Sequence, residues 1–301
     1  LDLDGQEEIQ INTGLMNVFL DPDRGGRMTE WDYKPASFNL TDALTRRPEV
    51  YHADLLKKAA SGGDAGDVHS IHDMVQAKEE NLERFLHTDR YERCGLLDHF
   101  FGGGTTLDAV TRCDYPEEGD FLDGPYRAEI KRLKDAVHVR LERRGRVGGL
   151  PVYLEKSVRV SAVSPSMEWN YRLVNEGETA LDTRFGVEFN FNLRAGDAPE
   201  RTYEIPGQFL EDKRLAGTGE CGPVREVRLR DAWLGFEIVL ELDDPSILWR
   251  FPIETVSSSE VGFERVYQAS CVIPFWRICL DPGTSWTTRL RLGVRALGKT
   301  S

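Results

Sequence analysis

Strict alternation of apolar and polar residues is the feature that most constrains how this chain can fold. In residues 136–142, Val137, Val139 and Leu141 occupy one side of an extended segment, and the residues between them are polar or charged. A period of two places alternate side chains on the two faces of a β-strand. The pattern recurs along most of the chain between short turn signals, so the sequence predicts a mainly β protein.

The connections between these segments are too short for parallel crossovers and therefore favour antiparallel pairing. The glycines at residues 25–26 separate two alternating segments and predict a hairpin. A chain of 301 residues is long enough for one large all-β domain. We therefore expect a single domain over residues 1–301, built as a large antiparallel β-sandwich of two twisted sheets.

Residues 53–90 depart from this pattern and have helical periodicity instead. Six apolar residues fall near one face of a helix, with Asp67 placed to cap its N-terminus: Val68, Ile71, Val75, Leu82, Phe85 and Leu86. We expect a helical and loop insertion over residues 53–93, between an opening hairpin and the main sandwich.

Charge and cysteine content exclude several classes of function. The formal net charge is −13, which repels phosphate backbones and anionic lipid, so we expect no nucleic-acid or membrane partner. No apolar run approaches the length that spans a bilayer. The five cysteines are odd in number and lack CxxC spacing, which favours a cytoplasmic protein over a disulfide-bonded one.

A calcium site near the N-terminus is the one cofactor hypothesis. Asp2 and Asp4 alternate before Gly5, as carboxylates do in a calcium loop, but the remaining oxygen ligands in fixed register are missing. A solvated acidic terminus is the alternative, and no other cofactor is expected.

Two strand segments carry polar side chains suited to carbohydrate. Glu188 and Asn190 share one face of residues 186–193, where carboxylate and amide groups could bind sugar hydroxyls; a solvated outer face is the alternative. Asp98 and His99 are a candidate acid–base or hydroxyl-binding pair. Because neighbours on a strand point to opposite faces, we expect no dyad between them and at least one buried structural group.

Four stretches together resemble the C-terminal region of glycoside hydrolase family 57, which holds α-amylases and 4-α-glucanotransferases. They are GGRMTEWDYKPASFNLTDALTRRPEVYH (25–52), VHSIHDMVQAKEENLERFLHTDRYERCGLLDHF (68–100), GVEFNFNL (186–193) and TVSSSEVGFERVYQASCVIP (255–274). The resemblance implies a galactose-mutarotase-like sandwich beside an N-terminal (β/α) barrel that carries the catalytic Glu and Asp. We expect that barrel to be absent from this chain, so no catalytic residue is assigned.

The resemblance also suggests a role for residues 30–52 at the active-site cleft or at the seam with the barrel. Trp31 and Tyr33 are then expected to stack on the rings of an α-glucan or maltooligosaccharide. Asp32 and Arg93 would bind hydroxyls or form ion pairs across the seam. Plain packing of the tryptophan at a sheet edge is the alternative.

Three functional hypotheses follow from these observations. The first is a non-catalytic accessory domain, carbohydrate-binding, of an α-1,4-glucan-acting enzyme, with the glucan and the catalytic barrel as its partners. The second is a stand-alone enzyme of aldose-epimerase type, using Glu188 with His99 or His138 as acid and base. The third is a purely structural domain whose exposed apolar surface docks the barrel.

Overall fold

The computed structural model describes residues 5, 7–60, 81–259 and 262–298. The strands within these residues are β1 (Ile9–Asn12), β2 (Met16–Asp21), β3 (Arg27–Tyr33), β4 (Phe38–Asn39), β5 (Leu97–Phe101), β6 (Arg127–Arg132), β7 (Ala136–Val147), β8 (Leu150–Ser161), β9 (Ser166–Asn175), β10 (Leu181–Phe191), β11 (Arg201–Glu204), β12 (Gly219–Asp231), β13 (Phe236–Ser259), β14 (Gly262–Leu280) and β15 (Ser285–Ala296). The helices are η1 (Lys34–Ala36), α1 (His52–Ala60), η3 (Leu82–Phe85) and α2 (Leu107–Thr111).

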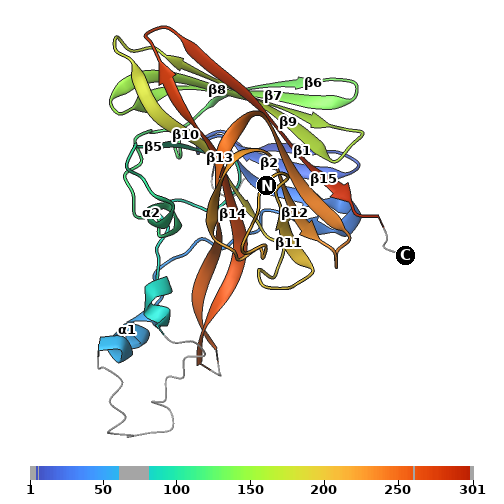
Figure 1. Ribbon diagram of the computed structural model, residues 1–301. Coiled ribbons are helices and arrows are strands. Elements are labelled where there is room, and N and C mark those ends of the chain that lie inside the picture. Colours follow the sequence, from blue (N-terminus) through green and yellow to red (C-terminus); the bar gives the residue numbers. More distant parts are fainter. Residues whose placement is uncertain (1–4, 6, 61–80, 260–261, 299–301) are drawn as a thin grey trace, which may run out of the picture.

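The strands form two antiparallel sheets (Figure 1). The small sheet has four strands in the order β1-β2-β3-β4. The large sheet has eleven strands, with a main path β5-β10-β14-β13-β15-β9-β8-β7-β6 and a branch in which β12 pairs with both β11 and β13. The antiparallel β-sandwich predicted from the sequence is confirmed.

The long strand β13 connects the two halves of the large sheet. Its first part pairs with β15, as in Phe236↔Ala296, and its second part pairs with β14, as in Ile247↔Phe275. Strand β12 pairs with the other edge of β13 from Phe236 to Arg250, and so spans the point where β13 changes neighbours. The register between β12 and β13 shifts near this point, as expected where a strand bends at a corner of a sandwich.

Glycine makes the predicted β2–β3 hairpin possible. Gly25 and Gly26 in the turn have φ angles of +74° and +55°, in the region that favours glycine. A Cβ atom at position 25 would also collide with the carbonyl oxygen of Leu122. The glycine pair therefore serves both the turn and the close approach of the neighbouring loop.

The main core lies where the small sheet packs against the large one. Val139 and Leu141 on β7 are fully buried, as their alternation predicts, whereas Val137 is half-buried. Trp31 on β3 is also fully buried; its ring meets Phe191 edge-on at 6.4 Å between centroids. The small sheet thus supplies large side chains to the same core as the large sheet.

The insertion packs against the far end of the β13–β14 hairpin, which projects from the sandwich (Figure 1). Leu55 of α1 and Leu82 of η3 form a small core with Val256 and Phe263 of the hairpin. Of the helix expected over 67–86, Leu82–Phe85 is a 3-10 helix, and the part before residue 81 lies outside the described residues.

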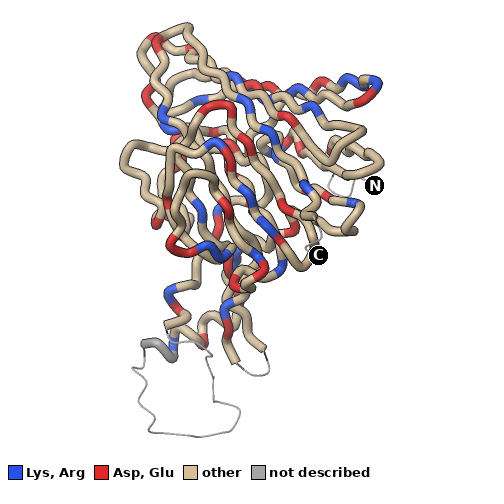
Figure 2. The backbone as a smooth tube through the Cα atoms, turned by 45° about the vertical axis from the view of Figure 1, so that its right-hand side comes forward, with Lys and Arg blue, Asp and Glu red and all other residues tan. Residues whose placement is uncertain are grey.

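Acidic and basic residues are interspersed along the strands rather than gathered into fields of one sign (Figure 2). On the outer sheet face, Arg291 contacts Glu168 at 3.3 Å and Asp243 at 3.2 Å, all partly exposed. Exposed pairs of this kind each contribute under about 1 kcal/mol. No helix of the described residues has the length and hydropathy needed to cross a membrane.

The burial of Trp31 generates a stability prediction. Replacing a fully buried tryptophan with alanine removes apolar contacts and leaves a cavity, so Trp31→Ala should lower the free energy of unfolding by about 3–5 kcal/mol. Trp233, with 65% of its surface exposed, is the matched control, and Trp233→Ala should change it by less than about 0.5 kcal/mol. Urea unfolding of the unaltered protein and the two variants measures both changes in the free energy of unfolding. Small changes of equal size in the two variants would contradict the placement of Trp31 in the core.

Candidate functional site

Arg93 is the centre of a buried ionic cluster under β5 and β10. Its guanidinium Nη2 lies 2.7 Å from Asp89 Oδ1, and its Nη1 lies 2.9 Å from Glu188 Oε1, with all three side chains fully buried. Tyr91 accepts a hydrogen bond from Arg93 and donates one of 2.8 Å to Glu188. Asn190 donates to the same carboxylate at 2.6 Å. Every charge in this group therefore has a close partner.

His99 completes the cluster from β5. Its Nδ1 lies 2.9 Å from Glu117 and its Nε2 lies 3.2 Å from Glu188. Burial alone would lower the pKa of His99, but the hydrogen bond to Glu117 and the negative charge of nearby Glu188 outweigh it and raise that pKa to about 9. Burial raises the pKa of Glu188, and Arg93 and His99 outweigh it, so that pKa lies well below its usual range. The imidazolium of His99 and the carboxylate of Glu188 are thus both charged at neutral pH.

Asp98 points to the other face of β5 and forms a second buried ion pair. Lys156 Nζ lies 2.7 Å from Asp98 Oδ2, and both side chains are fully buried. Tyr126 donates to the same oxygen at 2.9 Å, and Lys156 also donates to the carbonyl oxygens of Gly25 and Leu96. As the alternation predicts, Asp98 and His99 do not form a dyad, and both are buried structural groups.

Both earlier interpretations of the polar face on β10 need correction. Glu188 and Asn190 are fully buried, so this face is neither a solvated outer surface nor an open sugar-binding surface. Arg93, expected at a hydroxyl or at the seam, is likewise sealed inside the cluster. The sequence alternation showed that these polar groups share a face, but it could not show that the 89–93 segment covers them.

The other expected contact residues lie on β3 and make packing or polar contacts within the protein. Trp31 offers no exposed face to a sugar, and its Nε1 donates to Met16 Sδ at 3.2 Å, which corrects the expected stacking role. Tyr33 is half-buried and packs edge-on against Phe236 at 5.5 Å. Asp32 is half-buried and accepts a 2.9 Å hydrogen bond from Asn17. The packing alternative describes Trp31 better than the sugar contact.

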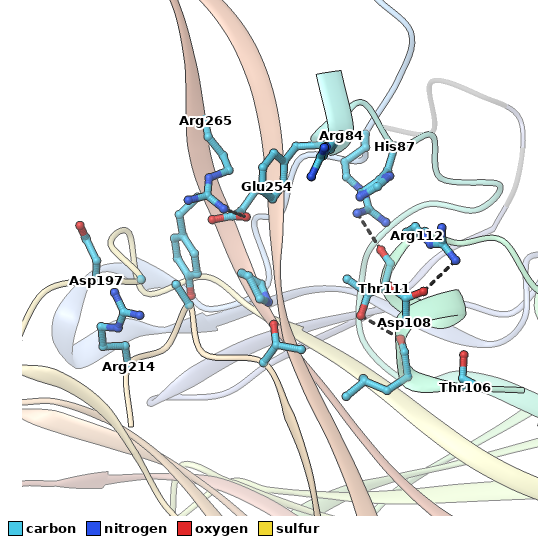
Figure 3. A pocket seen from close by; sticks show the side chains of 18 residues that line it. Arg84, His87, Thr106, Asp108, Thr111, Arg112, Asp197, Arg214, Glu254 and Arg265 are labelled. Carbon is cyan, nitrogen blue, oxygen red and sulfur yellow. Dashed lines mark hydrogen bonds and ion pairs between the residues drawn. The ribbon is translucent and has the colours of Figure 1, made fainter. Parts of the chain in front are cut away.

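An open cleft with a volume of about 900 Å³ lies elsewhere (Figure 3). Its lining comes from segments far apart in the sequence, which is why no local motif indicated it. The lining comes from the segment before α1, from η3 and the residues after it, from α2, from the loops around β11 and from the β13–β14 hairpin. It consists of Arg46, Arg84, Phe85, His87, Thr106, Leu107, Asp108, Thr111, Arg112, Gly196, Asp197, Arg214, Ala216, Thr218, Pro252, Glu254, Arg265 and Tyr267.

The cleft combines ion pairs, aromatic rings and a neutral histidine. Arg265 lies 3.3 Å from Glu254 and stacks over the Phe85 ring at 4.4 Å. Arg112 lies 2.7 Å from Asp108 on the facing wall. Burial lowers the pKa of His87, and the positive charges of Arg46 and Arg112 lower it further. Such a lining offers many hydrogen-bond donors and acceptors beside apolar surface.

No metal centre is formed by the described part of the chain, where no group of three His, Cys, Asp or Glu side chains is placed to hold an ion. Asp2 and Asp4, the calcium hypothesis, lie outside the described residues. All five cysteines are described and none forms a disulfide.

Comparison with known proteins identifies the family. Residues 1–290 match the family described as "Alpha-amylase/4-alpha-glucanotransferase, C-terminal". The chain belongs to this family. It is 35% identical to α-amylase 1 of Dictyoglomus thermophilum over 298 residues, which cover 98% of this chain and 41% of that protein. The resemblance found in the sequence is confirmed, and the chain spans only about two fifths of this relative's length.

Solved structures support the fold assignment. The 4-α-glucanotransferase from Thermococcus litoralis matches with a TM-score of 0.72 and 24% identity, covering 97% of this chain and 38% of that chain. A galactose mutarotase-like protein from Clostridium acetobutylicum matches with a TM-score of 0.61 and 12% identity, covering 97% of this chain and 96% of that one. The mutarotase-like sandwich expected from the family resemblance is therefore confirmed.

The raised pKa of His99 generates a pH prediction for this family member. Because the folded-state pKa of about 9 exceeds the ordinary 6.5, protonation stabilises the fold. That stabilisation contributes about 3 kcal/mol to the free energy of unfolding. It is fully present below pH 6.5 and is lost as the pH rises to 9. Urea unfolding across this range should show the fall, and His99→Gln should flatten it. An equal slope in both proteins would refute the assignment.

Proposed function

We propose that this chain is a non-catalytic accessory domain of an α-1,4-glucan-acting enzyme and that it holds maltooligosaccharide segments of the substrate. The observation that carries the proposal is the contrast between two sites. The candidate acid–base groups Glu188 and His99 are sealed, while a large polar and aromatic cleft is open.

The sealed cluster supports a non-catalytic role. A general acid or base must reach the proton that it transfers, directly or through one water. Glu188 and His99 are fully buried, and their partners Arg93 and Glu117 occupy their charged atoms. His138, the other candidate for an epimerase pair, lies on β7, near the opposite end of the strand order from β10. The aldose-epimerase alternative is therefore weaker.

Family membership supports a catalytic-domain partner. The relatives that carry α-amylase or 4-α-glucanotransferase names are longer than this chain, which matches 41% of the Dictyoglomus α-amylase and 36% of the Thermococcus kodakarensis glucanotransferase. The remaining part of such an enzyme would supply the catalytic barrel. The unpaired state of all five thiols supports a reducing, cytoplasmic location.

A purely structural role is the second candidate, and exposed apolar residues favour it. Leu44, Val50 and Leu56 are 61%, 92% and 52% exposed along one stretch of chain. Neighbouring exposed apolar residues often mark a protein–protein interface. A catalytic domain could cover these three side chains.

Calorimetric titration of maltoheptaose into the purified chain tests the proposal. We expect saturable binding with a Kd of about 0.1–10 mM, which corresponds to a binding free energy of roughly −3 to −5 kcal/mol. We expect no release of reducing sugar from amylose above the blank rate. Cellohexaose, with β-linkages, is the control ligand and should bind more weakly. Absence of binding at saturating maltoheptaose would favour the structural role, and sustained turnover of amylose would contradict a non-catalytic one.

A further inference from the structure

The structure assigns a location to this binding: we infer that the open cleft between the β13–β14 hairpin, η3 and α2 holds a neutral α-glucan segment of several sugar units. The inference rests on the proposed function and adds the site and the ligand's charge and size. Figure 3 shows labelled side chains on its walls: His87 near Arg112 and Asp108, Asp197 beside Arg214, and Glu254 with Arg265 on the strands between them.

The size of the cleft favours an oligosaccharide over a single sugar. Small-molecule sites typically enclose about 300–1,000 Å³, and this cleft, at about 900 Å³, is at the upper end of that range. Its lining extends from α2, across β13 and β14, to the loop around Arg214. A linear chain that lies across the hairpin would contact both walls, whereas a monosaccharide would contact only one.

Charge pairing favours a neutral ligand over an anionic one. The guanidinium groups of the cleft are matched by carboxylates: Arg112 by Asp108 at 2.7 Å, Arg265 by Glu254 at 3.3 Å, Arg214 by Asp212 at 2.8 Å and Arg46 by Asp89 at 2.6 Å. Arg84 is exposed and has no ion pair within the described residues. An anion would also meet the carboxylates of Asp108, Asp197 and Glu254.

The same ion pairs suit sugar hydroxyls. A hydroxyl both donates and accepts, so it can donate to a carboxylate and accept from the paired guanidinium without leaving a net charge buried. Arg265 is held in place by its stacking on Phe85, at 4.4 Å from the ring centroid. A fixed planar group loses less conformational entropy when it binds than a free side chain does.

His87 adds a neutral donor and acceptor to one wall. It is half-buried and has no side-chain hydrogen bond to another described residue. Burial and the nearby Arg46 and Arg112 lower its pKa, so the imidazole is neutral near pH 7. A neutral imidazole has one N–H and one acceptor nitrogen, which together match a single sugar hydroxyl or two neighbouring ones.

Tyr267 is half-buried and supplies partly exposed aromatic surface to the lining of the cleft. Its hydroxyl lies 2.7 Å from Ser270 Oγ, which fixes the ring. Gly196 allows the covering loop to approach: a Cβ atom there would lie 2.5 Å from Tyr267 Cδ2. An aromatic ring beside polar groups is the combination that recognises the apolar C–H face and the hydroxyl edge of a pyranose.

A bulky substitution in the cleft tests the location. Thr218 is exposed and lines the cleft, so Thr218→Trp should obstruct part of it without disturbing the core. We expect the Kd for maltoheptaose to rise at least tenfold. Thr179, exposed in the β9–β10 turn and absent from the cleft lining, is the matched control; Thr179→Trp should leave the Kd within twofold. Urea unfolding midpoints of both variants confirm that they fold.

A finer substitution tests the hydrogen bonds. His87→Ala should raise the Kd about fivefold to tenfold, because one or two hydrogen bonds of about 1 kcal/mol each are lost. His138→Ala, at a half-buried histidine on β7, should have no effect on binding. An excess of inorganic phosphate should not compete with the glucan. Competition would contradict the inference that the cleft binds a neutral ligand.

The outcomes separate this inference from the proposed function. If the unaltered chain binds maltoheptaose and Thr218→Trp binds it equally well, the glucan site lies elsewhere and the inference is wrong while the accessory function stands. If the unaltered chain does not bind the glucan at all, both are wrong.

Discussion

The pairing of Arg93 with Asp89 and Glu188 is the interaction on which the arrangement around the cleft depends. Transferring these charges from water costs several kcal/mol each, and only close partners offset that cost. The cluster therefore forms only when the 89–93 segment lies against β10. Asp89 also binds Arg46, so the same group fixes the chain that enters the insertion and the chain that leaves it.

Because both ends of residues 53–93 are fixed, the helices in this segment determine which side chains of the β13–β14 hairpin are covered and which are exposed. The hairpin projects from the sandwich, and its apolar side chains would be exposed without Leu55 and Leu82. Once these cover Val256 and Phe263, the polar residues Glu254 and Arg265 next to them line a cleft instead of a solvated strand edge. Packing of α1 and η3 against the hairpin therefore also forms the cleft.

The sequence predicted the sandwich, the β2–β3 hairpin and the opposite orientation of Asp98 and His99, because each depends on local alternation or turn chemistry. It did not predict the burial of Trp31 and Glu188. Burial depends on which distant segment covers a face of the strand. An alternation with a period of two shows only that the two faces of the strand differ in polarity. The cleft was missed for the same reason, since no two of its walls are close in sequence.

The two polar sites also differ in how a ligand could use them. In the Arg93 cluster a substrate would have to displace a partner of Glu188 or His99, leaving a buried charge uncompensated at a cost of about 3–5 kcal/mol. In the cleft, Arg265 and Glu254 are paired but partly exposed, so a hydroxyl can bind them without breaking the pair. Chemistry that needs a reactive, accessible charge is disfavoured at the first site, and reversible binding of a neutral polyol is favoured at the second.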